Sequence, residues 1–135
     1  MTEKEPAGAD ARILVAEDEI RLRRLIATVL ESSGYSVEVV ANGAAAWTRL
    51  VETPVIDLVV TDLHMPGMDG FELLRRMRKL PEPSRKPVIV LTAVGQIMDH
   101  AKAVELGAGR VMTKPFSSLE ILEAVKERLA GSGAT

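Results

Sequence analysis

The stretch Ile13-Leu14-Val15-Ala16-Glu17-Asp18-Glu19 joins a continuously apolar run to three consecutive acids. A strand without a polar face is typical of the centre of a parallel sheet, where helices cover both sides. Two later stretches repeat the pattern, because Leu58-Val59-Val60-Thr61 is followed by Asp62 and Val88-Ile89-Val90-Leu91 by Thr92. The three stretches therefore predict central strands of a parallel sheet with polar residues at their carboxyl ends.

Around these stretches, strand-like and helix-like segments alternate along the chain. We expect strands at Arg12–Ala16, Ser36–Val40, Leu58–Thr61, Val88–Leu91 and Arg110–Met112. We expect helices near 19–33, 43–52, 70–80, 97–106 and 118–130, of which the fourth has the thinnest apolar stripe. This alternation predicts an α/β fold.

The polarity of the strands also predicts their order. The second predicted strand alternates polar and apolar residues, and the fifth begins with Arg110 and ends near Thr113, so both suit the sheet edges. With right-handed crossovers, this favours a doubly wound, flavodoxin-like, five-stranded parallel sheet of order 2-1-3-4-5 with five helices. In that order the winding reverses between strands 1 and 3. Ligands bind at such a switch point, beyond the carboxyl ends of the strands.

Length and composition place the chain among ordinary folded domains. It has 135 residues, 47% hydrophobic and 27% charged, so one domain is expected. The absence of cysteine excludes disulfides and thiolate sites. A net charge of −2 gives no basic field for nucleic acid or an anionic membrane, and no apolar run approaches the roughly 20 residues of a spanning helix. We expect a cytoplasmic domain over 11–130, with flexible tails at 1–10 and 131–135, the second of which also suits a linker stub.

The acids at the switch point predict a metal site. Neighbouring strands lie about 4.8 Å apart, so Asp18 and Asp62 should face each other. Two carboxylates about 5 Å apart repel by roughly 3 kcal/mol at an effective dielectric of about 20. Mg²⁺ offsets such repulsion, because it binds one or two carboxylates together with phosphoryl oxygens. Thr92 and Lys114, after the next two strands, add a hydroxyl and an ammonium that can bind a transferred phosphoryl group.

These features resemble the response-regulator receiver domain of bacterial two-component signalling, of which chemotaxis regulators are an example. The resemblance runs from about Arg12 to Leu129. It is carried by four stretches in the family's order and spacing: Ile13 to Glu19, Val60 to Gly70, Leu91-Thr92-Ala93, and Thr113-Lys114-Pro115-Phe116, with Gly107-Ala108 before the last.

The resemblance implies a role for each residue of the site. Asp62 would be the phosphoacceptor, and Thr92 and Lys114 would bind the phosphoryl group. Mg²⁺ would be held by four groups: the side chains of Asp18 and Asp62, the backbone carbonyl of His64, and Glu17 through water. The Lys114–Pro115 peptide bond is often cis in this family. One departure concerns the switch position three residues before the lysine, where the family often has an aromatic ring that swings inward and this chain has Val111.

The implied function is a phosphorylation-dependent signalling switch rather than an enzyme acting on other substrates. The donor would be the phosphohistidine of a sensor histidine kinase or phosphotransfer protein. The output would be a downstream protein or an effector domain of the same chain, without direct binding of nucleic acid or membrane. A homodimer through the fourth helix, fifth strand and fifth helix is compatible with the resemblance.

Three other functions compete with this interpretation. A small-molecule phosphatase that forms an aspartyl phosphate usually has an acid two residues after the nucleophile, where this chain has His64. A flavin- or nucleotide-binding domain needs small residues after the first strand to cradle phosphate, whereas the acids there repel it. A receiver-like interaction module that is never phosphorylated usually lacks the acceptor or the lysine, and both are present here.

Overall fold

The computed structural model describes residues 11–52, 55–81 and 85–134. Five strands and five helices alternate along them. The strands are β1 Arg12–Ala16, β2 Ser36–Val40, β3 Leu58–Asp62, β4 Val88–Ala93 and β5 Arg110–Lys114. The helices are α1 Ile20–Glu31, α2 Gly43–Glu52, α3 Gly70–Arg78, α4 Ile97–Glu105 and α5 Ser118–Ala134. The predicted α/β alternation is confirmed.

All five strands run parallel in the order β2-β1-β3-β4-β5, as predicted. Pairing continues to the polar ends of the strands, with Asp62 opposite Leu91 and Thr92 opposite Thr113. β3, β4 and β5 therefore end one or two residues beyond their predicted ends, because backbone pairing does not depend on side-chain polarity. This register brings the carboxyl ends of the strands to one edge of the sheet.

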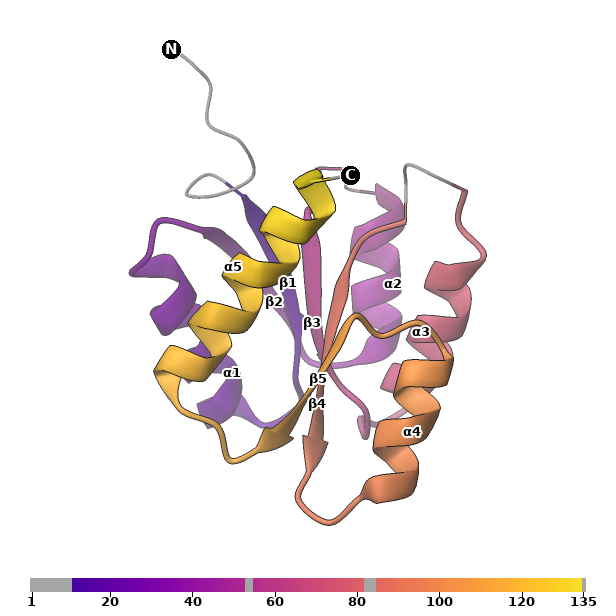
Figure 1. Cartoon of the computed structure of the whole chain (residues 1–135). Coiled ribbons are helices and arrows are strands. Elements are labelled where there is room, and N and C mark those ends of the chain that lie inside the picture. The colour runs from indigo at the N-terminus through magenta and orange to yellow at the C-terminus, as the bar shows by residue number, and fades with distance from the viewer. Residues whose placement is uncertain (1–10, 53–54, 82–84, 135) are drawn as a thin grey trace.

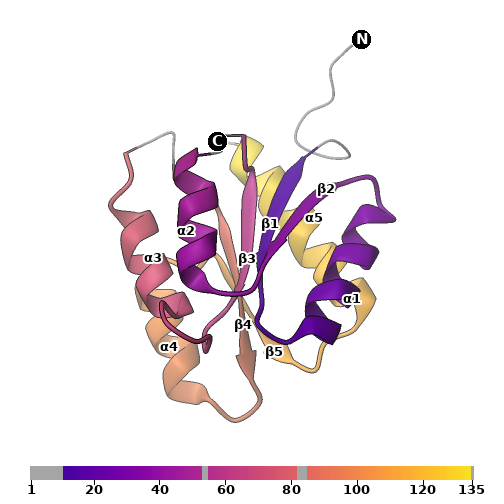
Figure 2. The same cartoon turned by 180° about the vertical axis from the view of Figure 1, so that it is seen from behind.

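Helices cover both faces of the sheet (Figure 1). α1 and α5 lie on one face and α2, α3 and α4 on the other, and Figure 2 shows the same layers from behind. Alternate residues of β1 enter two apolar clusters: Ile13 and Val15 pack with α1 and α5, whereas Leu14 and Ala16 pack with α2 and α3. Burial on both faces is the physical reason that the central strands have no polar side.

Side chains fix the starts of α1, α3 and α5. The carboxylate of Glu19 accepts a hydrogen bond from the amide of Leu22 (2.7 Å) at α1, and that of Asp69 accepts from the amide of Glu72 (3.0 Å) at α3. At α5, the Ser117 amide donates to the Glu120 carboxylate (2.7 Å) and the Glu120 amide donates to the Ser117 hydroxyl (3.1 Å). These bonds satisfy amides that a helix start otherwise leaves unpaired.

The end of α5 differs from the prediction. The helix continues to Ala134, whereas the sequence predicted an end near residue 130. The prediction rested on Gly131 and Gly133. Glycine weakens a helix by about 1 kcal/mol relative to alanine but does not by itself end one. The tail predicted at 1–10 lies outside the described residues.

α4 is the most thinly packed helix, in agreement with its thin apolar stripe. All nine of its residues are described, and Ala103 alone among them is buried. Ile97 and Met98 are 79% and 81% exposed. Among the described residues, the structure contains no helix with the length and apolar character needed to span a bilayer.

Gly70 holds the loop after β3 close to the end of the strand. Its amide donates to the carbonyl of Leu63 (2.8 Å). A Cβ atom added at Gly70 would collide with the carbonyl oxygen of Asp62 and lie 2.8 Å from the Cα of Leu63. The start of α3 is thus pressed against the backbone of Asp62, and only glycine fits there.

Replacing Gly70 therefore has a specific expected cost. Gly70→Ala should lower the free energy of unfolding by about 2–3 kcal/mol, because the rigid backbone must shift to admit the methyl group. Gly67 supplies the matched control: it has a φ of +73° but open space around its Cα, so Gly67→Ala should cost only about 1 kcal/mol. Urea unfolding measures both; equal losses would contradict the close packing at Gly70.

Candidate functional site

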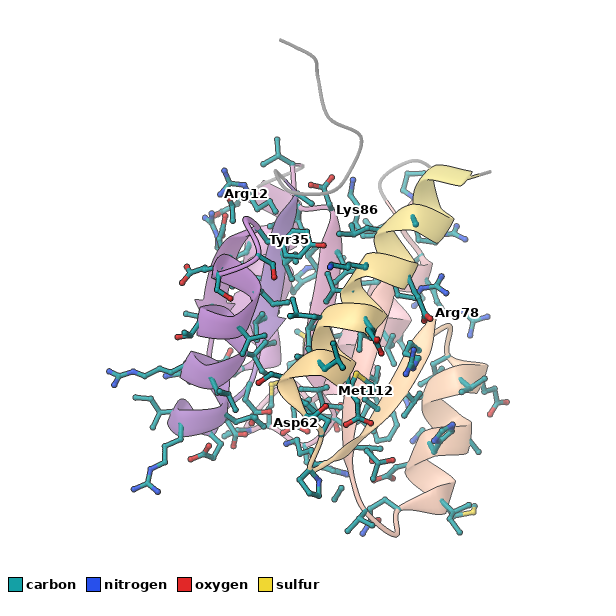
Figure 3. All side chains as sticks on the ribbon, turned by 60° about the vertical axis from the view of Figure 1, so that its left-hand side comes forward. Arg12, Tyr35, Asp62, Arg78, Lys86 and Met112 are labelled. Atoms are coloured by element: carbon teal, nitrogen blue, oxygen red, sulfur yellow. The ribbon has the colours of Figure 1, made fainter. Side chains whose placement is uncertain are left out.

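Four strands deliver polar side chains to one edge of the sheet. Glu17 and Asp18 follow β1, Asp62 ends β3, Thr92 lies near the end of β4, and Lys114 ends β5. Figure 3 shows Asp62 at the end of the molecule opposite to the labelled Arg12 and Lys86. The predicted switch point between β1 and β3 is thus where the acids gather.

The three acids converge as the strand spacing predicts. Carboxylate oxygens of Glu17, Asp18 and Asp62 all lie within 4.8 Å of one another. Asp18 is exposed, whereas Glu17 and Asp62 are buried. Three hard oxygen donors with one side open to solvent suit a cation such as Mg²⁺, which keeps several waters.

Glu17 is the most confined of these acids, because its side chain is fully buried. One carboxylate oxygen accepts a hydrogen bond from the amide of Glu19 (3.1 Å). Burial raises the pKa of the Glu17 carboxyl above its ordinary value of 4.5. The Glu19 amide opposes this, and the nearby charge of Asp62 adds to it. The charged form of Glu17 is therefore disfavoured, and a bound cation would stabilise it.

Lys114 neutralises part of this charge. Its ammonium Nζ lies 3.2 Å from Oε1 of Glu17 and 3.2 Å from Oδ2 of Asp62. Burial disfavours the ammonium, but attraction by Asp62 and Glu17 outweighs it and raises the pKa of Lys114 above 10.5. The long side chain thus reaches from the edge strand back to the centre, as expected, and the next peptide bond, Lys114–Pro115, is cis.

Asp62 is held in a defined orientation. Its Oδ1 accepts a hydrogen bond from the amide of Leu63 (2.8 Å), and its Oδ2 faces Lys114. Its backbone carbonyl accepts a bond from the hydroxyl of Thr61 (2.8 Å). A carboxylate fixed at both oxygens and at its carbonyl is preorganised for a reaction at a single position.

The hydroxyl of Thr92 has no partner. The residue is 2% exposed, and its Oγ1 makes no hydrogen bond with any described residue. Buried hydroxyls are nearly always bonded, so an unpaired one is a candidate donor for a bound oxyanion. Thr92 and Lys114 lie on adjacent strands at the same edge, which fits the two donors predicted for a phosphoryl group.

His64 lies two residues after Asp62, and its ring is bonded to α4. The ring is 62% exposed, and its Nε2–H donates to Oδ2 of Asp99 in α4 (2.7 Å). It also meets the ring of Phe71 edge-on, with 6.0 Å between centroids. Sequence reasoning placed an imidazole near the site but missed its bond to α4, because no local pattern connects residues 35 positions apart.

Val111 packs partly buried against the cluster beneath α2, α3 and α4. It also lines a surface cavity of about 380 Å³, together with Val94, Phe116 and other residues of β5 and its following loop. A valine side chain has no ring to swing. The cavity therefore leaves open space beside Val111.

Comparison with known proteins identifies the family to which the chain belongs. The sequence model for the response regulator receiver domain matches residues 13–126, so the chain belongs to that family. It is 39% identical over 118 residues to the phosphate regulon transcriptional regulatory protein PhoB of Rhizobium meliloti, covering 87% of this chain and 52% of the relative. The chain thus spans about half the length of this curated relative.

Solved structures agree with this assignment. The signal receiver domain of a signal transduction histidine kinase from Syntrophus aciditrophicus has a TM-score of 0.83 and 34% identity, covering 93% of this chain and 94% of that one. The receiver domain of the Francisella response regulator 1452 has a TM-score of 0.81 and 30% identity, covering 91% and 99%.

The raised pKa of Glu17 predicts how cation binding depends on pH. As the pH falls, Glu17 takes up a proton at a higher pH than an ordinary glutamate, and the proton competes with a cation. Below that pKa, Mg²⁺ affinity should fall by up to about tenfold per pH unit. Titration by NMR or calorimetry between pH 7 and pH 5 measures this. Glu17→Gln should flatten the profile, and an unchanged profile would contradict a role for Glu17.

Removing the ammonium should destabilise the fold. Lys114→Met leaves Glu17 and Asp62 buried together without a cation, so the free energy of unfolding at pH 7 should fall by about 1–3 kcal/mol. Mg²⁺ or a lower pH should restore part of the loss, since either removes net negative charge. Lys126→Met, on the exposed face of α5, should change stability by less than about 0.5 kcal/mol. Equal effects of the two variants would show that the buried charge cluster needs no counterion.

Proposed function

We propose that this chain is a phosphorylation-dependent switch that accepts a phosphoryl group on Asp62. The donor is the phosphohistidine of a sensor histidine kinase or phosphotransfer protein. The observation that carries the proposal is the convergence of a fixed carboxylate, two further acids, an unpaired buried hydroxyl and an ammonium at one sheet edge. Membership in the receiver family supports the same function.

In the proposed reaction, a carboxylate oxygen of Asp62 attacks the phosphorus atom and the bond from phosphorus to the donor imidazole breaks. Asp62 needs no general base, because its carboxylate is ionised at neutral pH. Thr92 and Lys114 donate to the transferred oxygens. When bound, Mg²⁺ would supply positive charge that stabilises the developing oxyanions. Its ligands would be Asp18, Asp62, the carbonyl of His64, and Glu17 through water.

An apolar groove beside Lys114 supports docking of a protein donor. The groove has a volume of about 450 Å³ and is lined by Leu22 and Leu25 of α1, by Ala93 and Val94, and by Pro115 and Phe116. Leu25 is 49% exposed although it belongs to the apolar stripe of α1. A partner that covers this groove would place a phosphohistidine next to the acids.

The output is part of the proposal. The curated relative named above is a transcriptional regulator, and the match covers 52% of its length, which supports an effector domain or a separate protein target downstream. We propose 11–130 as the receiver unit and the cytoplasm as its location. Three further points stay predictions. They are likeness to chemotaxis regulators, a homodimer through α4, β5 and α5, and the lack of direct nucleic-acid or membrane binding. The absence of activity on other substrates also stays a prediction.

Intact-mass measurement tests the proposal. Incubation with Mg²⁺ and a small phosphodonor should add the mass of one phosphoryl group, and chelation of the metal should prevent it. Asp62→Asn should abolish the addition. Asp57→Asn is the matched control, because Asp57 accepts a bond from the amide of Arg12 (2.9 Å) at the start of β1, away from the site. An unchanged wild-type mass with several donors and kinases would favour the interaction module instead.

A further inference from the structure

α4 is weakly attached to the rest of the fold. Its single buried residue is Ala103. Its N-cap residue, Gln96, makes no side-chain capping bond, whereas α1 and α3 are both capped. A helix with so little buried surface depends on its remaining contacts and moves when they change.

Two of those contacts reach the segment after β3, one in the loop that follows Asp62 and one in the first turn of α3. Asp99 accepts the bond from His64 (2.7 Å), and its side chain is only 20% exposed. One turn later, Nζ of Lys102 lies 4.4 Å from the centre of the Phe71 ring. A cation over an aromatic face at this distance is attractive. Because the His64 and Phe71 rings touch edge to face, the four side chains form one continuous network.

The loop side of this network is rigid. Phe71 is buried and directly follows Gly70, whose amide is bonded to the carbonyl of Leu63 (2.8 Å). The Leu63 amide in turn is bonded to the Asp62 carboxylate (2.8 Å). These bonds connect the Asp62 side chain to the backbone that carries His64 and to the start of α3.

We propose that Asp99 and Lys102 form a latch, through which α4 positions the loop after Asp62 and senses occupation of the site. The latch rests on the proposed function for its signal. It gives the chain a path from Asp62 to α4 that needs no ring at position 111. The exposed Ile97 and Met98 lie on the same helix, so a partner bound to them would act back on the site by linkage.

A double-mutant cycle tests the latch. Asp99→Ala and His64→Ala should each raise amide hydrogen exchange in α4 and weaken Mg²⁺ binding by about two- to fivefold, the range for exposed ion pairs. If the two side chains act through each other, the double variant should be no worse than either single variant. His64→Ala keeps the backbone carbonyl and leaves the charge at the start of α4 intact, so it separates the latch from a loss of helix stability.

Glu105→Ala is the matched control, because Glu105 is an acid of α4 that contacts Arg78 through its backbone carbonyl rather than the loop after Asp62 through its carboxylate. Lys102→Gln should raise α4 exchange in the same way as Asp99→Ala. Additive effects in the cycle, or an Asp99→Ala protein that behaves like Glu105→Ala, would overturn the latch. Failure of the wild type to gain a phosphoryl group would overturn the proposed function instead, since the exchange measurements need neither donor nor metal.

Discussion

Repulsion between buried carboxylates is the constraint on which the site depends. The parallel register brings Glu17 and Asp62 together where both are buried, and the apolar layers on both sides of the sheet hold the strands that carry them. Lys114 supplies one positive charge to two acids. Burial raises the pKa of Glu17, and the charge of Asp62 adds to the effect. The cluster also keeps net negative charge, which gives a divalent cation a favourable place to bind.

Most of the fold could be predicted from the sequence because burial in a parallel sheet has a direct signature. The apolar runs of β1, β3 and β4 predicted their central positions, and the polar residues of β2 and β5 predicted the edges. The meeting of Asp18 with Asp62 followed from strand spacing. The end of α5 could not be predicted, because glycine affects helix stability without fixing where a helix ends.

Other parts of the site depend on contacts that no local pattern encodes. Three consecutive acids follow β1, and the sequence does not indicate which of them is buried. In the structure Glu17 is buried and Asp18 is exposed. The bond from His64 to Asp99 joins a loop to a helix that sequence shows only as thinly apolar. A polar residue directly after a buried strand is a signal for burial that sequence reasoning could have applied to Glu17.

The parallel arrangement also places the start of β1 and the end of α5 far from the acids. β1 begins and α5 ends at the edge of the sheet remote from Asp62, as the positions of these elements in Figure 1 and of Asp62 in Figure 3 show. A fluorophore, solid support or fused module joined at either place would project away from the acids. Immobilised molecules would then present their reactive surface outward, which suits the domain to measurements on a sensor chip.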